Sequence, residues 1–371
     1  MKKVAVYTIC KNEMNNVAEW LMSVEGVDQI VMLDTGSEDN TPATISASGV
    51  EVTYIEALFE PFDFSRARNM ALSYVKPDIE YCVYLDLDER LEEGWLDSLR
   101  AYLQHDPHQV SMKMVLTVDD SDAPETTYHQ VRCHRRESYA WIYPCHEVLN
   151  YIGPDRLVSI AADIEVRHLK DASKKRDYLS LLENGVNSHP QDQRMAFYLG
   201  REYFYEGEYK MAYEKLLYAT TCPILNWDMQ VAECYLWLSK CSEKLGLDPE
   251  PWLIKRLSVS TDHAEFWCDL ALYYFELDHY AISLGFAMRA ISLQDAPLPT
   301  NYLFRDEGAY TWKPYDIAAY CYYYLEDYPS YAIYCGRALQ LNPNSTKLQQ
   351  NLASALRLIN GEVDDYSKTT D

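Results

Sequence analysis

The sequence lacks the short motifs that mark several large protein classes. It contains no Gly-x-Gly-x-x-Gly and no Gly-x-x-x-x-Gly-Lys-Ser/Thr, which argues against a dinucleotide dehydrogenase and a P-loop phosphotransferase. None of its ten cysteines forms a Cys-x-x-Cys pair, and their spacing fits neither a small disulfide-bonded domain nor a zinc module, so we expect free thiols in a reducing cytoplasm. No apolar run approaches the roughly 18 residues of a membrane span, and no signal peptide precedes Val4, so we expect no membrane span.

Basic residues are also scarce. The 371 residues include 57 acidic and 33 basic side chains, which give a formal net charge of −24 at pH 7. The acidic excess is spread along the whole chain, and this argues against non-specific binding to nucleic acid or to an anionic membrane. The length suffices for two domains with full hydrophobic cores.

The first half of the chain alternates segments of strand and helix character. Alternation of this kind predicts a mostly parallel, Rossmann-like α/β sheet with helices on both faces. Ligands of such sheets bind beyond the carboxyl ends of the strands. The predicted strands are 3–10, 29–34, 51–55, 81–85 and 163–167, and the predicted helices are 17–24, 41–47 and one that begins at Ser65 as its N-cap.

Two carboxylates follow the most apolar of these strands. Asp86 and Asp88 are two residues apart, so they project to the same side where the strand ends. Hard oxygen donors at this place suit a divalent cation that holds phosphate, although a solvated turn would use the same residues. Asn12, Glu13 and Asp34 also follow predicted strands, and their convergence at one edge favours a binding site.

Taken in order, several motifs resemble a known family. Cys10–Glu13, Leu33–Thr41, Phe64–Asn69, Asp86–Glu89 and Trp141–Leu149 are similar to motifs of inverting, family 2-like nucleotide-sugar glycosyltransferases of the GT-A fold. The resemblance is strongest to bacterial and phage enzymes that carry tetratricopeptide repeats behind the catalytic domain. It implies an α/β GT-A catalytic domain followed by an all-α, TPR-like repeat domain.

The resemblance also implies a metal site. Asp88 would hold Mn²⁺ or Mg²⁺ on the diphosphate of the donor, and Asp86 would reach the ribose or the metal through water. His168 matches the late metal-site histidine of the family, and an imidazole ligand would favour Mn²⁺. A solvated histidine at a strand end is the alternative for His168.

Donor-binding residues follow from the same resemblance. Cys10, Asn12, Glu13, Asp34 and Arg68 would surround the nucleoside, although Arg68 could instead pair with Asp34 or Asp86. An arginine fork fits diphosphate oxygens, so Arg132 or Arg135 could clamp the leaving group; ordinary solvated charges are the alternative.

The acceptor side is expected around residues 139–147. Inverting transfer needs one general base, for which Glu147 is the candidate, with His146 orienting it or contacting the acceptor. The aromatic segment 139–143 could form a wall against which a sugar stacks. The acidic residues Asp119, Asp120 and Asp122 are an alternative source of the base.

From about residue 193 the apolar residues take helical spacing. Leu199-Gly200-x-x-Tyr203 followed by Ala212 fits the tetratricopeptide pattern, and related helix pairs are expected near 229–245, 264–292 and 315–341. The expected domains are 1–186, the catalytic domain; 187–360, the repeat domain; and 361–371, a disordered tail. The repeats could hold the acceptor, a partner protein or a second copy of the chain in a homodimer.

Two classes of function compete at this stage. One is a metal-dependent inverting transfer from a nucleotide-sugar, most commonly a UDP-sugar, to a surface glycan, a protein or a hydroxylated DNA base. The other is a repeat scaffold with an inactive front domain. An enzyme of another class, a nucleotidyltransferase, would also use carboxylates and a metal, but it would be expected to lack His146-Glu147. The net charge counts against DNA, unless Lys170 and the basic run 174–176 form a local rim with the arginines.

Overall fold

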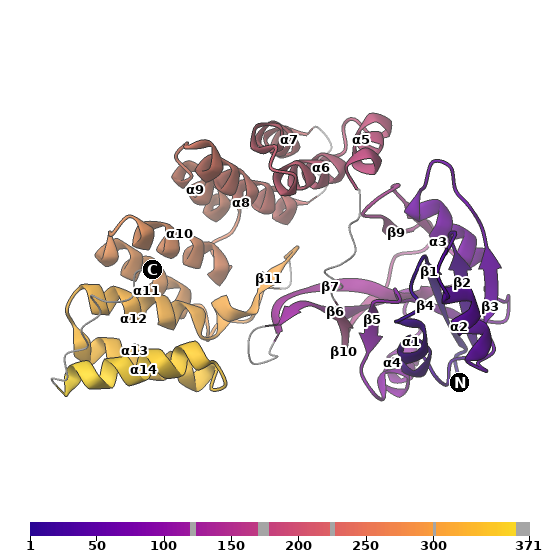
Figure 1. Cartoon of the computed structure of the whole chain (residues 1–371), viewed down its shortest axis with the longest axis horizontal. Helices are drawn as coiled ribbons and strands as arrows, with labels where there is room; N and C mark the ends of the chain where they lie inside the picture. The colour runs from indigo at the N-terminus through magenta and orange to yellow at the C-terminus, as the bar shows by residue number, and fades with distance from the viewer. Residues whose placement is uncertain (119–123, 170–177, 223–226, 300–301, 361–371) are drawn as a thin grey trace. The chain divides into compact units, whose positions relative to one another are not determined.

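The computed structural model describes most of the chain (Figure 1). The described residues are 1–118, 124–169, 178–222, 227–299 and 302–360.

These residues form two compact units. The first comprises residues 1–116 and 128–191, and the second comprises residues 117–127 together with the chain from Asp192 onward. The domain boundary expected after residue 186 falls inside α5 (Leu179–Ser188). The tail expected at 361–371 lies outside the described residues.

The first unit is built on a mixed sheet whose first half is parallel, as the alternation of strands and helices predicted. β1 pairs in parallel with β2 and β4, and β2 pairs in parallel with β3, whereas β7 runs antiparallel to β4. The strand order is β3 (Thr53–Glu56), β2 (Gln29–Asp34), β1 (Val4–Cys10), β4 (Tyr81–Tyr84), β7 (Pro124–Arg135), β6 (Gln109–Val118), β10 (Ser159–His168), β5 (Glu89–Leu91).

Each face of this sheet has its own hydrophobic core, because successive side chains of a strand point to opposite faces. Val4 and Val6 pack with Trp20 in one core, whereas Ala5 and Tyr7 belong to the other. Burial on both faces explains why β1 and β2 are almost continuously apolar. Helices α1 (Val17–Ser23), α2 (Thr41–Ala47) and α4 (Trp95–Leu103) contribute to the first core, and α3 (Phe64–Ser73) and β8 (Tyr139–Ile142) contribute to the second.

One helix start differs from the prediction. Helix α3 begins at Phe64, and its N-cap is Asp63, not Ser65. Asp63 has the extended backbone of a cap and accepts a hydrogen bond from the Arg66 backbone N–H at 2.9 Å, while Ser65 donates its hydroxyl to the same carboxylate at 2.7 Å. A carboxylate at a helix N-terminus also interacts favourably with the helix dipole, which explains why Asp63 takes this place.

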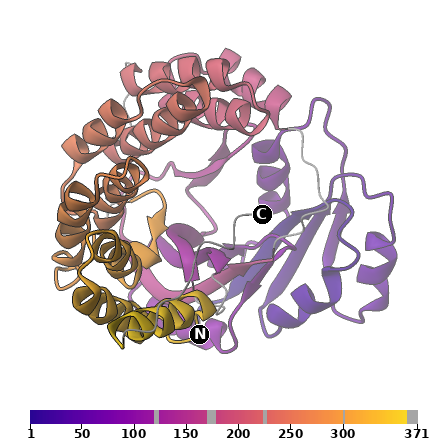
Figure 2. The ribbon, with the colours of Figure 1, turned by 60° about the vertical axis from the view of Figure 1, so that its left-hand side comes forward.

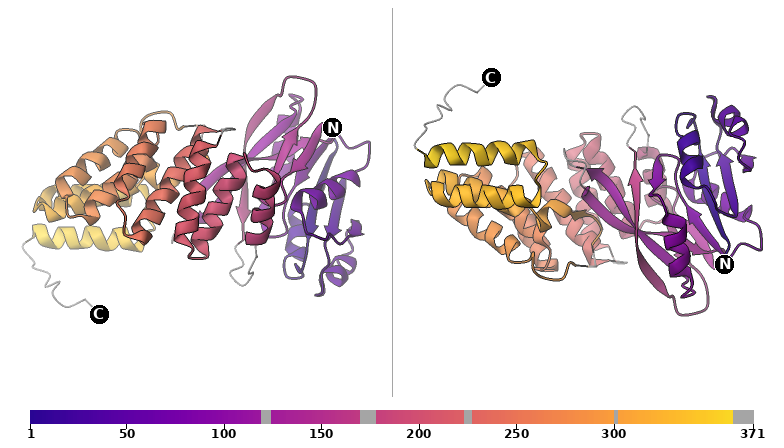
Figure 3. Two further views of the ribbon diagram at one scale, coloured as in Figure 1. Left: turned by 90° about the horizontal axis from the view of Figure 1, so that it is seen from above. Right: turned by 90° about the horizontal axis from the view of Figure 1, so that it is seen from below.

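The second unit is an array of antiparallel helix pairs, as expected for a TPR-like domain. The pairs stack into a curved array, which appears as an arc in Figure 2 and is seen from two further directions in Figure 3. They are α6 (Gln193–Tyr205) with α7 (Tyr209–Thr221), α8 (Asp228–Leu245) with α9 (Glu250–Val259), α10 (Ala264–Glu276) with α11 (Tyr280–Ile291), and α12 (Lys313–Tyr324) with α13 (Tyr328–Leu341), followed by α14 (Thr346–Ile359).

The segment between α11 and α12 folds onto the second unit. Within it, β11 (Arg305–Asp306) pairs antiparallel with Thr126 and Thr127 at the start of β7. The hydroxyl of Thr127 donates to Glu307 at 2.5 Å. The 3₁₀ helix η1 (Glu307–Tyr310) then packs into the core between α10, α11 and α12. The second unit therefore includes the start of β7, whose remaining residues belong to the first unit.

All ten cysteines are buried free thiols, in agreement with the sequence analysis. No helix in the described part of the chain has both the length and the apolar character needed to cross a membrane.

We expect Gly200→Ala to destabilise the second unit. A Cβ at Gly200 would lie 2.7 Å from Cγ and 3.2 Å from the backbone nitrogen of Leu216, so α6 and α7 would have to separate. Overpacking of this kind costs about 1 to 3 kcal/mol of unfolding free energy. Gly285→Ala in α11 is the matched control, since a Cβ there meets nothing within 4 Å and should gain about 0.5 to 1 kcal/mol. Urea unfolding of both variants checks this, and equal effects would contradict it.

The second unit also buries a carboxyl group beside η1. Glu265, in the first turn of α10, is 5% exposed, and Tyr310 and Asp306 lie near it. The nearby Arg256 is already paired with Glu233 at 2.8 Å and with Asp269. Burial therefore raises the pKa of Glu265 from 4.5 to about 7. The folded state keeps the proton that the unfolded state releases, so stability falls as the pH rises between these two values.

We expect Glu265→Gln to remove this pH dependence. Between pH 5 and pH 7.5 the wild type should lose about 2 kcal/mol of opening free energy relative to the variant. The protection of α10 amides, measured by native-state hydrogen exchange and corrected for the intrinsic rate, gives this quantity. Glu276→Gln, at the exposed end of the same helix, is the control and should keep the wild-type slope. Parallel slopes for wild type and Glu265→Gln would contradict the assignment.

Candidate active site at the carboxyl edge of the sheet

The sheet gathers most of the predicted site residues at one edge. Cys10 and Asp34 are register partners at the ends of β1 and β2, and Asp86 follows β4. After Asp88 the chain turns into β5, which runs antiparallel to β10 and brings Glu89 opposite His168. The backbone N–H of Leu169 donates to the carbonyl of Asp88 at 2.7 Å. This pairing explains why residues about 80 positions apart meet here.

The side chains of Asp88 and His168 lie next to each other. Oδ2 of Asp88 lies 3.6 Å from Nε2 of His168, and the two side chains are 10% and 27% exposed. Two atoms that coordinate one ion at about 2.1 Å are roughly 3 to 3.5 Å apart, so small adjustments suffice. In the described part of the chain, no group of three His, Cys, Asp or Glu side chains has the arrangement of a complete metal site.

Asp86 is held by Arg68, one of the two alternatives that the sequence left open for this arginine. Arg68 lies on α3, is 5% exposed, and places NH1 and NH2 at 2.8 and 3.0 Å from the two carboxylate oxygens of Asp86. Its Nε donates to Oε1 of Glu147 at 2.5 Å. Although burial opposes ionisation, Arg68 holds the pKa of Asp86 below its ordinary value. One arginine thus connects the expected donor side with the expected base.

Aromatic side chains support this arginine. Its guanidinium carbon is 5.0 Å from the ring of Trp141 and 5.6 Å from the ring of Tyr84. The Asn69 side chain bonds both the N–H and the carbonyl of Trp141, at 2.8 and 2.9 Å, which fixes β8 against α3. Tyr139 and Trp141 are 7% and 4% exposed. They are core residues, so the aromatic acceptor wall expected at 139–143 is wrong for these two side chains.

A second ion pair, formed by two buried side chains, also lies close to Tyr84. Arg132 of β7 donates from NH1 and NH2 to the two oxygens of Glu89 at 2.8 and 2.6 Å, and its guanidinium carbon is 4.5 Å from the Tyr84 ring. Arg132 and Glu89 are 3% and 4% exposed. Sequence reasoning missed that Glu89 is the partner of Arg132. The only signal for such a role was the position of Glu89 directly after Asp88.

The loops after β1 and β2 are bonded to each other. Oδ1 of Asn12 accepts from the backbone N–H of Glu38 at 2.8 Å, and Ser37 accepts from the Asn12 N–H at 2.9 Å. Asp34 is 1% exposed; its Oδ1 accepts from the N–H groups of Gly36 and Ser37, and its Oδ2 accepts from Tyr54. In this structure Asp34 therefore shapes the loop from within.

The remaining predicted donor and acceptor residues also lie near this edge. Cys10 is buried, and burial raises the pKa of its thiol well above its ordinary value. Oε2 of Glu13 accepts from Asn16 at 2.8 Å, beside the start of α1. His146 has a left-handed backbone with φ of 49° next to Glu147, and its ring lies 5.8 Å from the ring of Tyr178.

The structure does not bring Arg135 to this edge. Arg135 pairs with Tyr81 at the beginning of β4, whereas Asp86 follows the end of that strand. Its guanidinium instead bonds the carbonyls of Asp106 and Pro107. Antiparallel β7 thus carries Arg135 toward the opposite edge. Asp119, Asp120, Asp122, Lys170 and residues 174–176 lie outside the described residues.

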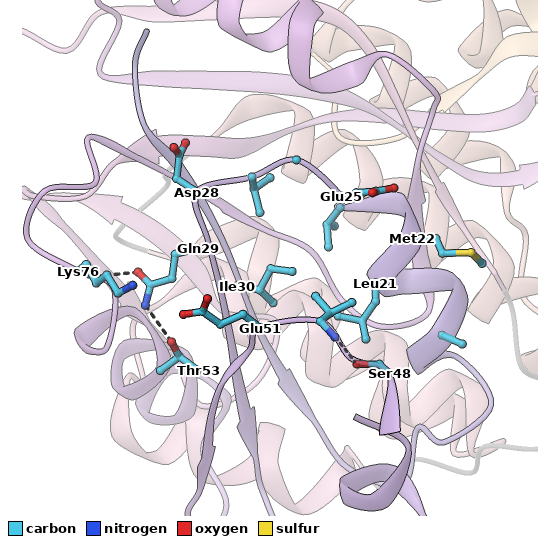
Figure 4. Close-up of a pocket in the computed structure, with 15 residues that line it drawn as sticks. Leu21, Met22, Glu25, Asp28, Gln29, Ile30, Ser48, Glu51, Thr53 and Lys76 are labelled. Carbon is cyan, nitrogen blue, oxygen red and sulfur yellow. Dashed lines mark hydrogen bonds between the residues drawn. The ribbon is translucent and has the colours of Figure 1, made fainter. Parts of the chain in front are cut away.

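A cavity of about 630 Å³ lies at the opposite edge of the sheet (Figure 4). It is lined by the end of α1, the start of β2 and residues of the loops around Glu51 and Lys76. The Gln29 side chain on its wall is already bonded to Thr53 and to the backbone of Lys76. None of the predicted site residues lines this cavity, so we place the site at the carboxyl edge.

Comparisons with known proteins identify the first unit. Residues 5–167 match the model of glycosyl transferase family 2, so the chain carries a domain of that family over somewhat less than half its length. The match contains Asp86, Asp88 and Glu147, and His168 directly follows its last residue.

The comparisons also cover the helical unit. A TPR repeat-containing protein of Synechococcus elongatus is 27% identical over 230 residues, which are 57% of this chain and 55% of the relative. The chain thus spans about half the length of the curated relative that it matches. Among solved structures, yeast Tom70 matches 52% of this chain and 38% of its own at 15% identity and a TM-score of 0.40. A thermophilic TPR protein of Thermus thermophilus covers 48% and 88% at 20% identity and a TM-score of 0.32.

We expect Arg68→Met to destabilise the first unit strongly. The change removes the buried partner of two ion pairs and leaves the partly buried carboxylates of Asp86 and Glu147 without their shared counter-ion, which costs about 3 to 5 kcal/mol. Arg66→Met, on an exposed position of the same helix, is the control and should cost less than about 1 kcal/mol. Urea unfolding measures both, and adding Glu147→Gln to Arg68→Met should restore part of the loss. Similar losses for the two arginines would refute this account of Arg68.

Proposed function

We propose that this protein is a metal-dependent, inverting glycosyltransferase that moves a sugar from a nucleotide-sugar, with a UDP-sugar as the first candidate, to an acceptor hydroxyl. The observation that carries the proposal is the meeting of Asp88 with His168 and of Asp86 with Glu147 through Arg68, in a family 2 domain and at the edge where sheets of this kind bind ligands. The ten free thiols favour action in a reducing compartment.

A divalent cation fits the charges of this edge. Asp86, Asp88, Glu89 and Glu147 with Arg68 and Arg132 carry a formal net charge of −2. Asp88 and His168 would hold the ion, with Asp86 acting through water or on the ribose. When bound, Mn²⁺ or Mg²⁺ would neutralise the charge that develops on the departing diphosphate.

Glu147 is suited to the part of general base. In a single displacement, the acceptor oxygen bonds to the anomeric carbon while the bond from that carbon to the diphosphate oxygen breaks, and the acceptor proton passes to the carboxylate of Glu147. Arg68 fixes one oxygen of that carboxylate and so orients it. His146, the preceding residue, would contact the acceptor. Attack opposite the leaving group inverts the anomeric centre.

The helical unit would recruit the acceptor or a second copy of the chain. Stacked helix pairs provide an extended surface, which is how repeat arrays commonly bind their partners. A surface glycan, a protein side chain and a hydroxylated DNA base all present suitable hydroxyls, and the net charge of −24 disfavours DNA.

Calorimetric titration with UDP, GDP, CDP and ADP, each with and without Mn²⁺, tests this function. We expect one nucleotide to bind in a metal-dependent manner. Asp88→Ala should abolish the metal-dependent part, whereas Asp97→Ala, on an exposed position of α4, should not change it. Undiminished Mn²⁺-dependent binding to Asp88→Ala would refute the assigned ligand.

Glu147→Gln separates binding from transfer. The variant should keep the nucleotide affinity of the wild type within a few-fold and lose hydrolysis of the matching nucleotide-sugar, in which water replaces the acceptor. A general base typically contributes 10²- to 10⁴-fold, so a loss of about that size is expected. Turnover equal to that of the wild type would move the base to another residue.

A further inference from the structure

Arg132 is enclosed where β4 ends. Cys133 pairs with Val83, so Arg132 lies beside Tyr84, the last residue of β4, and its guanidinium covers the Tyr84 ring. Both terminal nitrogens are occupied by Glu89, and Nε points at the sulfur of Met114 at 3.2 Å. With 3% exposure, this guanidinium makes its contacts within the protein.

The partner of Arg132 controls the conformation of the loop that bears the aspartates. Oε2 of Glu89 accepts from the backbone N–H of Asp86 at 2.9 Å as well as from Arg132. The N–H of Glu89 in turn donates to the carbonyl of Asp86 at 3.0 Å. These two bonds close the turn 86–89 from both sides. Because Glu89 is also the register partner of His168, the same residue sets the position of β5 against β10.

Direct binding of the donor diphosphate by Arg132 would require breaking its ion pair with Glu89, which is unfavourable in free energy. To reach a diphosphate, Arg132 would have to release Glu89, which is 4% exposed and lies near the charges of Asp86 and Asp88. Leaving one partner of a buried ion pair uncompensated is strongly destabilising. A single charged hydrogen bond from arginine to phosphate returns less than this cost. Because this cost exceeds the return, Arg132 keeps its pair with Glu89.

We propose that Arg132 is a positioning residue: through Glu89 it fixes the turn that presents Asp86 and Asp88, and it does not itself bind the diphosphate. This inference rests on the proposed function, since it assigns to the turn the task of holding metal and donor. It also replaces the leaving-group clamp that residue type alone suggested for Arg132.

The direction in which nucleotide affinity changes distinguishes a positioning role of Arg132 from a role as diphosphate clamp. The probe is UDP, or whichever nucleotide the wild type binds in the presence of Mn²⁺. If Arg132 acts through Glu89, then Glu89→Gln and Arg132→Lys should each weaken this Mn²⁺-dependent binding by about tenfold or more. Residues that orient metal ligands typically contribute 10- to 100-fold. The double variant Glu89→Gln/Arg132→Met should lose no more than the singles. If Arg132 were a clamp, Glu89→Gln would free it and binding would strengthen, also without Mn²⁺. Tighter binding to Glu89→Gln would overturn the proposal.

Hydrogen exchange tests the positioning role without any nucleotide. The amides of Asp86 and Glu89 should exchange about tenfold faster in Arg132→Lys and in Glu89→Gln, while amides of β2 stay unchanged. Unchanged exchange of the turn in both variants would overturn the proposal. If the wild type binds no nucleotide, the proposed function fails, and the exchange rates still decide whether Arg132 positions the turn.

Discussion

Two buried arginines make the acidic edge of the sheet possible. Asp86, Glu89 and Glu147 lie in surroundings where an isolated carboxylate would lose much of its hydration, so each needs a fixed positive partner. Arg68 and Arg132 supply these partners from α3 and β7, and both guanidinium groups lie close to the ring of Tyr84. Asp88 lies beside these pairs, with Oδ2 3.6 Å from Nε2 of His168.

The sheet topology brings these charged side chains together at one edge. Parallel β1, β2 and β4 end at one edge, and the short antiparallel β5 turns the chain back along β10, so that His168 meets Asp88. The candidate base enters from a different segment, because β8 is bonded to α3 through Asn69 and Trp141. The groups expected on the donor side and on the acceptor side thus come from separate parts of the chain and meet at Arg68.

Sequence reasoning predicted the strands well where burial on both faces makes them continuously apolar, as in β2. It placed Asp86 and Asp88 at one edge with Asn12, Glu13 and Asp34, since parallel strands share their carboxyl ends. His168 and Glu147 were added from the family resemblance and from the chemistry that the reaction needs. It could not assign Arg132, because a carboxylate and a diphosphate both accept an arginine fork. It also misplaced Arg135, which stands three residues further along the same strand and therefore on the other face and nearer the other edge. The cap at Asp63 was missed because Ser65 is an equally good cap by residue type.

The pairing of β11 with the start of β7 has a consequence for synthesis of the chain. Thr127 and its partner Glu307 are 180 residues apart, and both belong to the second unit. At roughly 5 to 20 residues per second, a ribosome would need about ten to forty seconds to produce the partner after Thr127 has emerged. During that interval the start of β7 has an open backbone edge, and Pro124 at its first position lacks the N–H that an intruding strand would need. The nascent chain therefore carries local protection against premature pairing until the repeats are complete.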